Sequence, residues 1–133
     1  MKVFLPVAGF FGFIGVLMAA LGSHYLSQVM VGKNYQDYQL ALRYELLHSV
    51  ALMIIGLFGF VTRKPFCLLQ LSAYLMVVGI IFFCGSIYLL TIYSARDLVY
   101  LIPVGGTAFL LAWFVVFIAG IYYYFHAVHA HDF

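Results

Sequence analysis

Charged residues are scarce in this sequence. Asp, Glu, Lys and Arg together make up 8% of its 133 residues, whereas hydrophobic residues make up 67%. Soluble domains contain roughly 25% charged residues, so this composition excludes water as the main solvent of the chain. The length is that of one domain, residues 1–133. The six Lys and Arg residues are not clustered, which argues against a nucleic-acid partner and against a polybasic lipid anchor.

Cysteine is also rare, with Cys67 and Cys84 as the only two. Both lie in one apolar stretch, where the helical rise of about 1.5 Å per residue separates them by roughly 25 Å. They therefore cannot form a disulfide with each other. Thiols in an apolar stretch are typical of packing positions rather than of reactive sites, and the redox compartment stays open.

The residue sets that enzymes use are missing. The sequence contains no Ser/His/Asp set, no paired carboxylates and no glycine-rich nucleotide loop. His126, His129 and His131 have a spacing that can collect a transition metal, but no Cys or carboxylate cage accompanies them. We therefore expect no catalytic residue, no metal site and no cofactor, and we predict that the protein is not an enzyme.

Long apolar runs are what the sequence does contain. A hydrocarbon core about 30 Å thick needs about 20 apolar residues in a helix, and four stretches are close to this length or exceed it: residues 3–26, 44–61, 66–93 and 98–125. The first stretch is too long for a cleavable secretory signal. The predicted fold class is an all-α membrane protein, a four-transmembrane-helix bundle with antiparallel, up-down-up-down topology.

The segment before the second span, residues 35–43, is polar with interspersed apolar residues. We expect it to form a helical lead-in at the membrane interface. Four spans place both termini on one side, where Lys2, Arg63 and Lys64 balance Lys33, Arg43 and Arg96 on the other. The positive-inside count is thus a tie. If Arg43 is discounted as a packed residue, the side with the termini faces the cytoplasm.

Small residues recur within the spans at heptad spacing. In lipid, such residues mark the places where two helix backbones approach closely. The glycines expected at helix contacts are Gly12, Gly15, Gly22, Gly79, Gly85, Gly105 and Gly106. They predict a tightly packed bundle whose bulky Phe, Leu and Ile side chains face lipid.

Polar residues gather at one end of the predicted bundle. Alternating span direction brings together the end of span one, the start of span two, the end of span three and the start of span four. The residues of this predicted polar cluster are His24, Arg43, Tyr44, Glu45, His48, Ser86 and Tyr88. Ionisable residues within the membrane are costly and indicate a functional site by default.

Three interpretations of the polar cluster stay open. The first is structural, with imidazoles and charges hydrogen-bonded across helices. In the second, the cluster handles a proton or a ligand. In the third, His24 and His48 bind a metal or haem from adjacent helices. Residues 103–106, Pro-Val-Gly-Gly, are expected to be a packed helix start, with an anion-binding helix N-terminus as the alternative.

Four segments resemble the YgdD-type family of small membrane proteins, a domain of unknown function. They are residues 21–24 (Leu-Gly-Ser-His), 41–44 (Ala-Leu-Arg-Tyr) followed by His48, 84–90 (Cys-Gly-Ser-Ile-Tyr-Leu-Leu), and 103–106 running on to Trp113. Ser23 replaces the usual alanine of the family, and Glu45 stands where glutamine is common. The resemblance implies four spans and a multi-pass location in the bacterial inner membrane. It implies no activity.

Two functions therefore compete. The first is a structural or accessory component that packs with a larger membrane complex, which the absence of a soluble domain favours. The second is a small oligomeric carrier or binder of a proton, ion or lipophilic ligand that uses the polar cluster near one membrane face. Beyond the lipid bilayer, the expected partner is a membrane protein or further copies of this chain.

Overall fold

The computed structural model describes residues 1–61 and 66–130, the last four of them by their backbone alone. Four long helices in this part of the chain have the length and hydropathy of membrane spans. The first comprises α1 (Phe4–Leu21), the π-helical turn η1 (Gly22–Leu26) and α2 (Ser27–Val29), and α3 (Lys33–Val61) is the second. The third comprises α4 (Cys67–Gly79), the π-helical turn η2 (Ile80–Cys84) and α5 (Gly85–Tyr93). The fourth is the 3-10 helix η3 (Arg96–Tyr100) followed by α6 (Leu101–Ala130).

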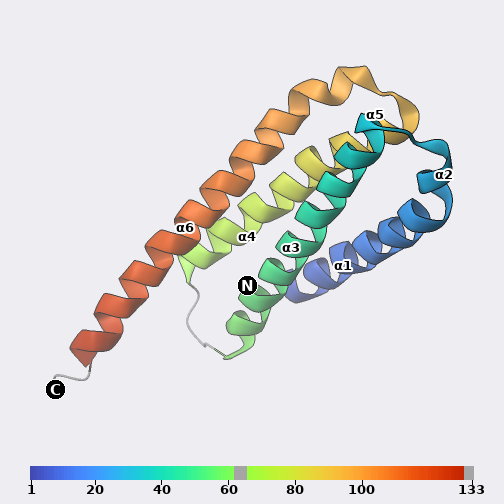
Figure 1. Ribbon diagram of the computed structural model, residues 1–133. Helices are drawn as coiled ribbons and strands as arrows, with labels where there is room; N and C mark the ends of the chain where they lie inside the picture. The colour runs from blue at the N-terminus through green and yellow to red at the C-terminus, as the bar shows by residue number, and fades with distance from the viewer. Residues whose placement is uncertain (62–65, 131–133) are drawn as a thin grey trace.

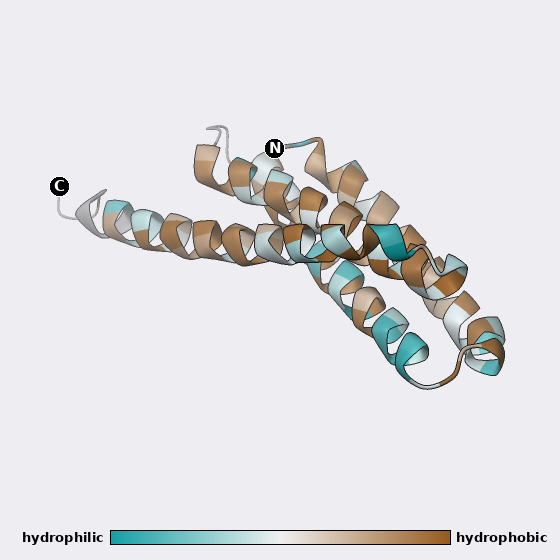
Figure 2. Ribbon diagram, turned by 90° about the horizontal axis from the view of Figure 1, so that it is seen from above, coloured by the Kyte–Doolittle hydropathy of each residue, from teal (hydrophilic) through white to brown (hydrophobic). Residues whose placement is uncertain are grey.

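Successive long helices run in opposite directions, so the start of α1 and the end of α6 lie at the same end of the molecule (Figure 1). α1 packs on α3, α3 packs on the α4–η2–α5 helix, and α6 packs on α4 and η2. The predicted antiparallel four-helix bundle is confirmed. Hydrophobic residues cover most of its length, and hydrophilic residues gather in the first turns of α3 (Figure 2).

The core is centred on α3, whose buried positions recur every three or four residues. Tyr38, Glu45, Leu52 and Gly59 are spaced by seven and all buried. A heptad of buried positions gives a helix a continuous inward stripe, which matches the packing of α3 against both neighbouring helices. One carboxyl group, that of Glu45, therefore lies inside the bundle.

The second span begins earlier than the sequence indicated. α3 runs without a break from Lys33, so residues 35–43 are helical as expected and form its first turns, continuous with the second span. The turn before it uses Gly32 at φ +66°, a conformation that glycine adopts without strain. Tyr38 then anchors these turns, because its hydroxyl donates to the carbonyl of Met18 at 2.5 Å and its side chain is fully buried.

Five of the seven glycines expected at helix contacts lie against a neighbouring helix. A Cβ at Gly15 would lie 2.7 Å from Leu46 Cδ2, and one at Gly22 would lie 2.7 Å from Tyr38 Cε1. At Gly79 it would meet the Phe109 ring, and at Gly105 it would meet the backbone of Phe83. Gly106 is looser, at 3.7 Å from Phe83 Cδ2. These positions let α1 approach α3, and let α6 approach the α4–η2–α5 helix.

Gly12 and Gly85 differ from the other five. A Cβ at either position would meet no described atom within 4 Å, so neither glycine mediates a close helix contact. Heptad spacing cannot distinguish a glycine that touches a neighbour from one that leaves a gap. At Gly85 the gap is part of the site described below.

Arg43 is exposed. It therefore cannot be discounted as a packed residue in the positive-inside count, and the tie between the two membrane faces stands.

Candidate functional site

Two ionisable residues of α3 are buried one turn apart. Glu45 is 2% exposed and His48 is 1% exposed. Both belong to the predicted polar cluster, but the structure gives them different partners. His48 contacts α6, whereas Glu45 contacts α5. The cluster therefore divides into two separate arrangements.

Hydrogen bonds occupy both ring nitrogens of His48. Trp113 on α6 donates its indole N–H to Nε2 at 3.1 Å, and Nδ1 lies 2.7 Å from the carbonyl oxygen of Tyr44. An indole N–H can only donate, so Nε2 accepts and the ring proton lies on Nδ1, which donates to the carbonyl. The ring also stacks on Phe109 with centroids 3.7 Å apart. In this arrangement His48 has no free nitrogen for a metal, a haem or His24.

The remaining polar residues on this side of the cluster point outward. His24 lies exposed in η1, and Arg43 and Tyr44 are exposed on α3. The Tyr44 ring packs on Phe83 with centroids 5.0 Å apart. The His24–His48 pair considered from the sequence is therefore not formed. His48 lies on the inward stripe of α3, whereas His24 is exposed on η1. The sequence alone does not show which way His24 turns.

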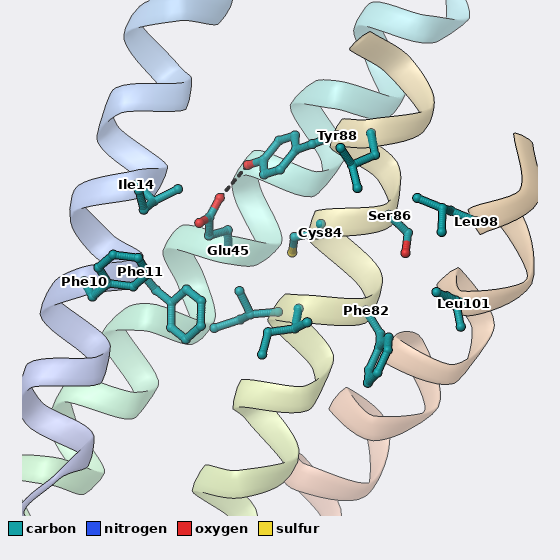
Figure 3. Close-up of a pocket in the computed structure, with 14 residues that line it drawn as sticks. Phe10, Phe11, Ile14, Glu45, Phe82, Cys84, Ser86, Tyr88, Leu98 and Leu101 are labelled. Carbon is teal, nitrogen blue, oxygen red and sulfur yellow. Dashed lines mark hydrogen bonds between the residues drawn. The ribbon is translucent and has the colours of Figure 1, made fainter. Parts of the chain in front are cut away.

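The second arrangement joins Glu45 to Tyr88 on α5. The Tyr88 hydroxyl donates to Glu45 Oε2 at 2.6 Å (Figure 3). In the described part of the chain this is the one polar partner of the Glu45 carboxyl group. Gly15 leaves room for the carboxyl group on the α1 side, since a Cβ there would lie 3.6 Å from Glu45 Cδ. Oε2 is thus paired inside the bundle, whereas Oε1 is available to another donor.

Glu45 lines an apolar groove with a cavity of about 500 Å³. We call it the Gly85 groove, because Gly85 lies in its floor and leaves open space above the helix. Side chains of α1 form one wall and Leu98 and Leu101 form the other, with η2 and α5 between them (Figure 3). The lining residues are Phe10, Phe11, Ile14, Glu45, Ile80, Ile81, Phe82, Cys84, Gly85, Ser86, Tyr88, Leu89, Leu98 and Leu101. Phe10 and Ile81 are more than half exposed, so the groove opens on the lipid-facing surface of the bundle.

Sequence reasoning identified Glu45, Ser86 and Tyr88 but missed the walls of the groove. Phe10, Phe11 and Ile14 look like ordinary lipid-facing residues, and Cys84 was expected only to pack. One signal was present: Gly-Ser-x-Tyr-Leu occurs at residues 22–26 and again at 85–89. The first copy is the π-helical turn η1 and the second directly follows the π-helical turn η2. Single π-helical turns within α-helices are frequent at functional sites.

A second cavity, of about 300 Å³, continues from the first along α5. It shares Tyr88 and Leu89 with the Gly85 groove and reaches Tyr25 and Leu26 of η1. Residues of both copies of the repeated segment therefore line neighbouring cavities.

The other predicted features lie away from this groove. Pro103 is in the first turn of α6, where its missing N–H removes no helix hydrogen bond, and its carbonyl accepts from Thr107 at 2.8 Å. His126 Nδ1 lies 3.0 Å from the Tyr122 carbonyl oxygen. His131 lies outside the described residues, and His129 is described by its backbone alone.

Comparisons with known proteins place this architecture among named relatives. The family model described as Protein of unknown function (DUF423) matches residues 18–106. The chain is 31% identical to a UPF0382 membrane protein of Staphylococcus epidermidis over 119 residues, covering 90% of this chain and 95% of the relative. It is 31% identical to the UPF0382 inner membrane protein YgdD of Escherichia coli K12, covering 90% of each chain. A UPF0382 membrane protein of Haemophilus influenzae is 31% identical and covers 83% of this chain and 86% of the relative. No solved structure matches.

Proposed function

This chain belongs to the family described as Protein of unknown function (DUF423), and from that premise we propose that it binds a lipophilic ligand within the bilayer and is not an enzyme. The YgdD-type resemblance seen in the sequence is confirmed. The chain is an integral, multi-pass membrane protein. The Escherichia coli relative is named an inner membrane protein, and we assign this chain to the same membrane.

The observation that carries the proposal is the position of the Glu45 carboxyl group. It is buried at the wall of a groove whose other lining groups are almost all apolar. A carboxyl group inside a membrane costs free energy and by default indicates a functional site. The cavity volume of about 500 Å³ lies within the range of roughly 300–1,000 Å³ typical of small-molecule sites, which combine apolar walls with few polar groups.

A binding role also fits the groups that the site offers. Acid–base catalysis needs a group that holds or releases a proton next to the reacting atom. Both nitrogens of His48 are engaged by Tyr44 and Trp113, and the described residues bring no second carboxyl group to Glu45. The groove can hold and orient a molecule, but we find no set of residues in it to transform one.

The accessory role expected from the sequence is the second candidate. The His48–Trp113 bond is compatible with it, because this half of the polar cluster is used for helix packing within the chain. An accessory protein should co-purify from gently solubilised native membranes with one larger partner at fixed stoichiometry. Recovery only as a monomer or a homo-oligomer would remove this candidate.

Native mass spectrometry of the full chain, released from native membranes in mild detergent, tests the binding function. We expect a lipophilic molecule to remain attached at one per chain. Gly85→Leu fills the groove without meeting any described atom within 4 Å at its Cβ, so the attached molecule should be lost while the fold is kept. The matched control is Gly120→Leu, since Gly120 has equally open space on α6 and lies outside the groove.

Loss of the adduct in the Gly85 variant alone supports the proposal. Equal retention in both variants, or an adduct no more abundant than bulk phospholipid, contradicts it. Near-ultraviolet circular dichroism of both variants shows whether each keeps the native packing of its aromatic residues.

A further inference from the structure

The geometry points to an uncharged lipophile with an alcohol or phenol hydroxyl as the ligand of the Gly85 groove, bound by that hydroxyl to Glu45 Oε1. This inference rests on the proposed function and adds the chemical class of the ligand. It follows from which hydrogen-bonding positions of Glu45 are occupied by Tyr88 and which remain open to a ligand.

The Glu45–Tyr88 pair leaves the second carboxyl oxygen without a partner among the described residues. Tyr88 has a single O–H, which it donates to Oε2, so the phenol has no donor left to offer. Oε1 has no partner in the described part of the chain, and Figure 3 shows it turned away from Tyr88 toward α1. The Tyr88 oxygen can still accept a hydrogen bond, but Oε1 is the unpaired oxygen of the buried carboxyl group, and we assign it to the ligand head.

A hydroxyl fits this oxygen in either protonation state of Glu45. An ionised carboxylate only accepts hydrogen bonds, whereas a protonated one also donates. A hydroxyl donates to the first and accepts from the second, so it stays paired when the proton moves. A ketone or ether can only accept, and an ammonium group can only donate.

Charge excludes the other common lipid heads. The groove contains no cationic side chain among its lining residues, so a phosphate or fatty-acid head would face Glu45 without compensation. An ammonium head would form an ion pair with apolar walls around it, and such pairs seldom recover the cost of removing both charges from water. An uncharged head avoids both costs. The apolar part of the ligand then lies between the α1 wall and the Leu98 wall.

The test uses a matched series of photoreactive probes with one hexadecyl chain carrying a diazirine. The heads are a hydroxyl, its methyl ether, a carboxylate and an ammonium. The full-length chain is reconstituted in phosphatidylcholine nanodiscs and irradiated, and labelled peptides are mapped by mass spectrometry. Labelling of the peptide with Phe10, Phe11 and Ile14 reports the groove, and labelling around the exposed Phe114 of α6 reports general lipid contact.

We expect the alcohol to label the groove peptide about tenfold more than its methyl ether, because the ether cannot donate to an ionised Glu45; the factor is the size of one hydrogen bond to a carboxylate. The carboxylate and ammonium probes should label it no more than the ether does. In the double variant E45L/Y88F the alcohol should lose its advantage. Replacing both partners by apolar residues of similar shape removes the carboxyl group that binds the hydroxyl, and it leaves neither Glu45 nor Tyr88 as an unpaired polar group.

The outcomes separate the ligand class from the proposed function. If the carboxylate or ammonium probe labels the groove best, or if all heads label it equally above the α6 control, the groove binds lipophiles but the hydroxyl inference is wrong. If no probe labels the groove above the control, the proposed function fails as well. A tenfold preference for the alcohol that persists in E45L/Y88F overturns the assignment to Glu45.

Discussion

Two hydrogen-bonded side-chain pairs engage the buried Glu45 and His48, and each pair joins α3 to a different helix. Glu45 pairs with Tyr88 and His48 pairs with Trp113. In a membrane such bonds contribute modestly, about 0.6 kcal/mol on average and up to about 1.7 kcal/mol. The larger effect of these bonds is to determine which polar atoms remain available to a ligand. His48 has no free nitrogen, whereas Glu45 keeps a free oxygen.

For the first pair we expect Tyr88→Phe to destabilise the bundle by about 0.6–1.7 kcal/mol, because it leaves Glu45 Oε2 buried without its donor. Glu45→Leu should have a similar cost, since it leaves the Tyr88 hydroxyl unpaired. The double variant should be close to the wild type. A double-mutant cycle measured by unfolding in sodium dodecyl sulfate, followed by the fluorescence of the single tryptophan, gives the coupling. Additive single effects would show that the two side chains do not interact.

For the second pair we expect nitrogen-15 NMR to show His48 as the neutral tautomer with its proton on Nδ1. The indole N–H of Trp113 should be coupled to Nε2 through the hydrogen bond. Trp113→Phe removes that donor, so the Nε2 resonance should shift while Nδ1–H stays bonded to the Tyr44 carbonyl. A proton on Nε2 in the wild-type protein would contradict the assignment.

The sequence shows where the long helices lie, but it does not show the π-helical turns within them. Apolar runs of span length predicted the four long helices. In the second span, the spacing of Glu45, Ser49, Leu52, Gly56 and Gly59 indicated an inward face, and all five are buried. The π-helical turns at η1 and η2 were not predictable. They insert a wider turn within a helix without a proline that would signal a break, and η2 contains no polar residue either.

Residue type and spacing also determine which residues of the candidate site the sequence revealed and which it did not. Glu45 and Tyr88 stood out because polar residues are rare in apolar spans. Their pairing depends on which face each helix turns toward its neighbour. Sequence periodicity indicates that face only where a long row of similar residues follows it. The lipid-side walls, Phe10 and Leu98 among them, have no chemical signature because a groove in a membrane protein is lined by the same residues as its outer surface.

At the level of helix contacts we expect Gly105→Ala to destabilise the bundle. Its Cβ would meet the backbone of Phe83, which cannot move aside like a side-chain tip, so α6 must shift. The expected cost is on the order of 1–3 kcal/mol, as for other overpacked interiors.

The matched change Gly120→Ala meets no described atom within 4 Å and should be neutral or stabilising by up to about 1 kcal/mol, because alanine favours helix more than glycine does. The same unfolding assay compares the two variants. Equal stability would mean that α6 does not approach Phe83 as closely as the structure shows.

For the molecule as a whole, the topology places the start of α1 and the end of α6 at one end of the bundle (Figure 1). Single cysteines introduced at Lys2 and His126 should therefore react with a membrane-impermeant maleimide from one side of sealed vesicles. Cysteines at Gly32 and Ser94 should react only from the other side. The variants need a background in which Cys67 and Cys84 are replaced by alanine. Labelling of Lys2 and Gly32 positions from the same side would refute a first span that crosses the bilayer.

The Gly85 groove opens sideways into hydrocarbon, with the more than half exposed Phe10 and Ile81 on its rim. A ligand of the proposed class would therefore reach it by lateral diffusion after partitioning from water, with each buried CH₂ group favouring the membrane by about 0.8 kcal/mol. Occupancy is then set by the mole fraction of the ligand among lipids and not by its aqueous concentration. Adding lipid or detergent at constant protein and ligand amounts should empty the site by dilution in two dimensions.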